Sequence, residues 1–106
     1  MSEPTSLHDV ERELDRVVDR LMSMPLAKAA TTTPDVMSAA QALLDHTRRI
    51  DPQVPEGASL PTLEPQGFGP LIAVLGRDWL AAARSVQDPD TDSVLAILVS
   101  LRRALP

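Results

Sequence analysis

Apolar residues recur at alternating three- and four-residue steps near the start of the chain. The positions are Leu7, Val10, Leu14, Val17, Leu21 and Met24. This spacing places them on one face of an α-helix, which repeats every 3.6 residues. Ser6, with the acidic Asp9 three residues later, is a typical helix start. Pro25 lacks the amide donor that a continuing helix needs. We therefore predict a helix over residues 7–24.

A second helix is predicted over residues 34–50. Thr33, Pro34 and Asp35 supply a capping hydroxyl, a proline at the first helical position and an acid in the first turn. The apolar stripe that follows consists of Val36, Ala40, Leu43, Leu44, Thr47 and Ile50. Arginines in the last turn and Pro52 just beyond it mark the end. Residues 26–30 have room for one further helical turn.

Two more helices are predicted in the second half of the chain, over residues 70–87 and 91–105. Pro70 opens the first of them, and Gly76 within it permits the close approach of a neighbour. Asp90 or Thr91 caps the second, whose apolar residues cover most of its circumference. A helix of this kind is expected at the centre of a core or against a partner. Residues 94–99 also suit a strand, but the chain offers no second strand to pair with.

Residues 51–69 are predicted to form a long loop, because residues 51–70 contain five prolines, Pro70 included, and three glycines. A loop of this length in a compact domain is unusual. Val54, Leu60, Leu63 and Phe68 within it are expected to pack onto the helices. Together these elements predict an all-α bundle of about four helices. We expect a single domain over residues 1–106, with residues 1–5 as a disordered tail.

Composition and charge narrow the classes of function. Only 2% of the residues are aromatic while 43% are hydrophobic, so the core must be aliphatic. A net charge of −5 without any basic block disfavours nucleic acid as a partner. The longest apolar stretch, residues 94–101, is far shorter than the ~20 residues of a membrane span. The acidic N-terminus lacks the pattern of a secretory signal, so a cytoplasmic protein is expected.

Several acidic residues and a histidine share one flank of the first predicted helix. His8, Glu11, Asp15 and Asp19 are spaced so that all four lie on this flank. Imidazole and carboxylate groups are suitable ligands for a divalent cation, so the flank is a candidate site for a metal or small molecule. Metal sites in helical bundles draw ligands from at least two helices, and the chain has no Glu-x-x-His sequence. Ion pairs with Arg12 and Arg16 explain the same residues.

Catalysis has little support in the sequence. The chain has no cysteine and no Gly-x-Ser-x-Gly motif, and its glycines do not form a phosphate-binding pattern. His46 lies at the border of an apolar stripe, and only a residue from elsewhere in the fold could supply the acid that a catalytic or pH-sensing histidine needs. We therefore expect a protein that is not an enzyme and binds no cofactor.

The surplus of apolar surface favours a protein–protein interaction module that dimerises or docks on a protein partner. The first helix has the spacing of a coiled coil, and an antiparallel copy could pair Glu13 with Arg20, although packing within one bundle uses the same stripe. The predicted contact surface consists of Val18, Met22, Arg77, Leu80 and Arg84. A DNA-binding regulator is the remaining alternative, but the turn at Asp88-Pro89-Asp90 is acidic where phosphate would approach.

Overall fold

The fold is all-α, as the sequence predicts. A computed structural model describes residues 5–54, 60 and 63–106. Its α-helices are α1 (Leu7–Ser23), α2 (Leu26–Ala30), α3 (Thr33–Ile50), α4 (Phe68–Ala83) and α5 (Thr91–Ala104), and a short 3₁₀ turn covers Pro65–Gly67. The described ranges contain no strand. Apart from Thr5, the predicted tail over residues 1–5 lies outside the described residues.

Helix α4 differs most from its predicted bounds of 70–87. It begins two residues earlier, at Phe68, because the 3₁₀ turn leads directly into it. Pro70 is therefore the third helical residue, and there its missing amide costs no helical hydrogen bond. The helix ends at Ala83 because the amides of Ser85 and Val86 bond three residues back, to the carbonyl oxygens of Ala82 and Ala83. Such tighter turns are common at helix termini.

The start of α1 has the predicted capping box. The Asp9 amide donates to the Ser6 hydroxyl oxygen at 3.2 Å, and the Ser6 amide donates to the Asp9 carboxylate at 3.0 Å. These bonds satisfy donors that the first turn of a helix leaves unpaired. The backbone hydrogen bond from Ser6 is the largest cause holding the pKa of Asp9 below its ordinary value. The sequence therefore predicts this helix start correctly.

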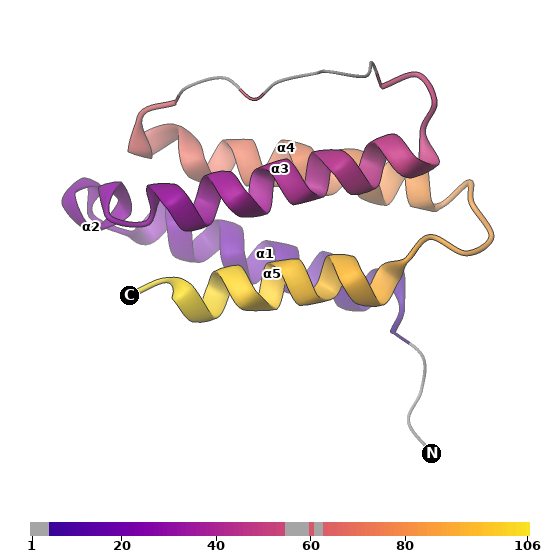
Figure 1. The fold of residues 1–106 in the computed structure, drawn as a ribbon. Helices are drawn as coiled ribbons and strands as arrows, with labels where there is room; N and C mark the ends of the chain where they lie inside the picture. The colour runs from indigo at the N-terminus through magenta and orange to yellow at the C-terminus, as the bar shows by residue number, and fades with distance from the viewer. Residues whose placement is uncertain (1–4, 55–59, 61–62) are drawn as a thin grey trace.

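The four long helices form a bundle in which α1 and α3 each pack against both α4 and α5. Helices α1 and α5 run in one direction, and α3 and α4 run in the other (Figure 1). Because α3 and α4 are parallel, the end of α3 and the start of α4 lie at opposite ends of the bundle. Of the predicted loop 51–69, residues 65–67 form the 3₁₀ turn, Phe68 and Gly69 belong to α4, and residues 55–59 and 61–62 lie outside the described residues. No helix in the described ranges is long and apolar enough to span a membrane.

The core is aliphatic around two large aromatic side chains, as composition requires. Phe68 and Trp79 are each only 1% exposed. The stripe of α1 enters this core through Val10, Leu14, Val17 and Leu21, which are all buried. Packing within the bundle therefore uses the seam that also resembles a coiled coil.

Gly76 permits the close approach of α1 and α4 that its position predicts. A Cβ atom at Gly76 would lie 2.5 Å from Cδ1 of Leu14, closer than two carbon atoms can approach. A side chain at position 76 would therefore require the buried Leu14 side chain to shift.

Helix α5 lies at the side of the bundle and is not enclosed by the other helices. Val94, Leu98 and Leu101 face the core. Ala96, Ser100 and Ala104 on its outer side are exposed. Of the two places predicted for this helix, the centre of the core is therefore wrong, because its main contacts are with α1 and α3 on one side, and contact with a partner stays a prediction.

Candidate interaction surface

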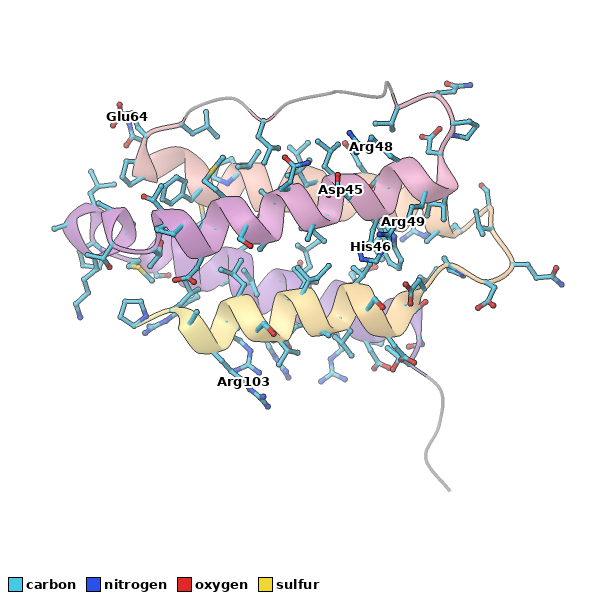
Figure 2. The ribbon with its side chains drawn as sticks, in the orientation of Figure 1. Asp45, His46, Arg48, Arg49, Glu64 and Arg103 are labelled. Atoms are coloured by element: carbon cyan, nitrogen blue, oxygen red, sulfur yellow. The ribbon has the colours of Figure 1, made fainter. Side chains whose placement is uncertain are left out.

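An open groove with a mainly apolar lining lies between α3 and α5. Its volume is about 350 Å³. Helix α3 contributes Asp35, Ser38, Ala39 and Ala42, and α5 contributes Ala96, Ile97, Ser100, Leu101 and Ala104. Most of these side chains are short, so they leave the space between the outer flanks of the two helices unfilled. Figure 2 views the molecule from this side, with α3 and α5 in front.

The outer side of α3 forms the upper wall of this face. Asp35, Ser38, Ala42, Asp45 and Arg49 follow one another at steps of three, four, three and four residues. Such positions line up along one side of a helix. Asp35, Ser38 and Arg49 are exposed, while Ala42 and Asp45 are partly buried. The α3 stripe, meaning these five residues, therefore has small side chains at Ser38 and Ala42, a charge at each end, and a third charge at Asp45.

The charges at the two ends of the α3 stripe have no ionic partner. Within the part of the chain that the structure describes, neither Asp35 nor Arg49 takes part in an ion pair. Asp45, by contrast, accepts hydrogen bonds from Arg48 and from Gln41, each at 3.0 Å. Each end charge is favourably placed for the helix dipole, because Asp35 is in the first turn and Arg49 in the last.

His46 lies near an acidic residue, Asp90, at the end of the bundle where α5 begins. Its Nδ1 lies 4.0 Å from a carboxylate oxygen of Asp90, and the imidazole side chain is 13% exposed. Asp90 immediately precedes the first residue of α5. The contact therefore joins the C-terminal half of α3 to the start of α5. Sequence reasoning identified the need for this acid but could not name it, because 44 residues separate the pair along the chain.

The acidic flank of α1 is used for ion pairs with α4. Glu11 lies 3.6 Å from Arg84 and Asp15 lies 3.8 Å from Arg77. The expected ion-pairing partners Arg12 and Arg16 are therefore wrong for these two acids. His8 and Asp19 are exposed. Within the described ranges, no group of three His, Asp or Glu side chains is placed to hold a metal ion.

The fold exposes some residues of the predicted contact surface and buries others. Met22 is 63% exposed, as expected, whereas Val18 is partly buried against the core. Arg77 and Arg84 are exposed but pair with the acids of α1. Leu80 is only 4% exposed, so its assignment to the surface is wrong. Leu80 lies one helical turn beyond Gly76 and packs beside Leu14, on the side of α4 that contacts α1.

Glu13 is a buried acid that the sequence pattern did not reveal. Its side chain is 5% exposed and accepts hydrogen bonds from Arg102 and from Arg16. Arg20 donates to the carbonyl oxygen of Pro106. Both residues expected to pair between antiparallel copies thus have partners within the chain. Glu13 is one residue before Leu14, at the edge of the apolar stripe. This position was the feature of the sequence that could have indicated its burial.

These features define one candidate site, the α3/α5 face. It consists of the groove and the α3 stripe, with the unpaired charges of Asp35 and Arg49 at its ends. None of its central residues appears in the contact surface that the sequence suggested. Short side chains carry little signal in a hydrophobic pattern, so the regular spacing of the stripe was the only indication. No protein-family model, no curated protein and no solved structure matches the chain.

Proposed function

We propose that this chain is a non-enzymatic protein–protein interaction module that associates with a second copy of itself. The observation that carries the proposal is the apolar groove between α3 and α5. Ile97 and Leu101 line this groove beside exposed alanine and serine side chains. Burying such a surface against a partner is favourable at roughly 25 cal/mol for each Å² of apolar area.

The same surface offers little to other classes of partner. Asp35 is the one charged side chain in the lining of the groove, and the turn before α5, near His46, exposes Asp88 and Asp90. Acidic groups at this point oppose the approach of a phosphate backbone. A protein surface with matching small and apolar side chains is the chemistry that complements the groove.

Sedimentation velocity over a concentration series, from low micromolar to near millimolar, tests the proposal. We expect the sedimentation coefficient to rise with concentration towards that of a dimer. Association through small apolar side chains should persist in high salt, because ionic strength screens only the exposed charges. A sedimentation coefficient that stays at the monomer value over the whole range would contradict self-association.

A further inference from the structure

We propose that two copies of this chain dock through their α3/α5 faces in a two-fold symmetric arrangement with the two α3 helices antiparallel. In this arrangement, Asp35 of each copy lies opposite Arg49 of the other. The inference rests on the proposed function and specifies the surface and the geometry of association.

The shape of the α3 stripe permits close helix packing. Ser38 and Ala42 lie near its middle, and neither side chain extends far from the backbone. The three-and-four spacing of the stripe is the spacing by which one helix presents a continuous line of side chains to another. Beside the stripe, the groove can accept side chains from a facing helix. The same patch serves both copies in a two-fold dimer.

The charges of the stripe select the direction of pairing. Asp35 and Arg49 each lie seven residues from Ala42, which is about 10 Å along the helix. A two-fold axis at Ala42 that reverses one helix therefore brings each aspartate to the arginine of the other copy. A parallel arrangement would instead place aspartate against aspartate and arginine against arginine. Like charges facing each other oppose association, so only the antiparallel arrangement is complementary.

The two end charges are also free to make this contact. Both side chains are exposed, and neither has an ionic partner among the described residues. The acids and arginines on the α1/α4 side of the molecule already pair with each other across those helices. The α3 stripe thus carries, among the described residues, charges of both signs without an ionic partner beside an apolar groove.

A charge exchange tests the geometry. Asp35→Arg and Arg49→Asp should each weaken association by about tenfold or more, because each creates two like-charge contacts in a symmetric dimer. The double variant Asp35→Arg/Arg49→Asp should restore affinity to within about threefold of the original, since both contacts are again between opposite charges. Sedimentation equilibrium measures the dissociation constants.

Thermal unfolding of dilute monomer separates dimer effects from effects on the fold. Each reversal is unfavourable for the α3 dipole, so the monomer of the double variant should be the least stable. Only a contact between copies makes the double variant associate better than either single variant. If the double variant associates no better than the single variants, the antiparallel pairing is wrong.

Substitution at the centre of the stripe provides an independent test. Ala42→Trp should prevent association because the indole separates the two α3 helices, whereas Ala81→Trp on the exposed side of α4 should leave association unchanged. If Ala42→Trp still dimerises like the original chain, self-association stands but uses another face, and this inference is overturned. If the original chain is a monomer at every concentration, the proposed self-association itself fails.

Discussion

At the scale of single residues, two glycines of α4 face α1. The effect of replacing each glycine by alanine on the stability of the fold depends on the α1 atom that the added methyl group would meet. A Cβ atom at Gly76 would lie 2.5 Å from Cδ1 of Leu14, and one at Gly69 would lie 2.7 Å from Sδ of Met22. Leu14 is 1% exposed and surrounded by the core, whereas Met22 is 63% exposed. Met22 can therefore turn away into solvent, and Leu14 cannot.

We predict that Gly76→Ala destabilises the fold by about 1 kcal/mol, because overpacking a core costs about 1–3 kcal/mol and outweighs the gain in helix propensity of about 0.5–1 kcal/mol. Gly69→Ala is the matched control and should be neutral or slightly stabilising. Urea unfolding followed by the fluorescence of the buried Trp79 measures both changes. Equal effects at the two positions would contradict this account of α1 and α4.

At the scale of secondary-structure elements, the start of α1 depends on the charge of one carboxylate. The backbone amide of Ser6 donates to Asp9, and this bond is the main reason that the pKa of Asp9 is lowered. A carboxyl group with a lowered pKa in the folded state stabilises that state at pH values above its ordinary pKa. The stabilisation is lost as the pH falls through the lowered value.

We predict that Asp9→Asn lowers the stability of the chain at neutral pH. The difference between this variant and the original chain should shrink as the pH falls through the pKa of Asp9, because protonation removes the same charge from the original chain. Denaturant unfolding at a series of pH values measures the difference. A gap that does not depend on pH would mean that the carboxylate charge contributes nothing to the helix start.

At the scale of the whole molecule, the proposed self-association would couple to folding. A partner that binds only the folded chain raises its apparent stability, and the effect grows with the concentration of that partner. When the partner is a second copy, the melting temperature depends on the concentration of the protein itself.

We predict that the Tm of the original chain rises with protein concentration and that the Tm of Ala42→Trp does not. Circular dichroism at the helical signal measures both over the same concentration series. A Tm independent of concentration in the original chain would argue against a dimer of the folded form. A rise that is equal in Ala42→Trp would instead locate the contact on another face.

Much of the fold follows from local patterns in the sequence. The capping box at Ser6 and the stripe that begins at Val10 predict α1 because both depend only on residues within one helix. The proline and acid predict the start of α3 to within one residue, although the N-cap residue is Thr32 and not the predicted Thr33. The density of proline predicts the absence of a long helix over residues 51–54 and 63–64, which are the parts of this connection before the 3₁₀ turn that the structure describes as a continuous chain. Local hydrogen bonding and backbone restriction are sufficient to determine these features.

The candidate surface could be identified only from the tertiary structure. Hydrophobic periodicity identifies the buried side of a helix but not the neighbour that covers it. Leu80 was therefore assigned to a contact surface, although α1 buries it. Glu13 and Arg102 are far apart in sequence, and only the packing of α1 beside α5 makes them an ion pair.

The sequence by itself determined the helices and their apolar sides, because these depend on residues one turn apart. Only the tertiary structure decided which charges remain unpaired and where the groove lies, because those properties depend on which helices become neighbours.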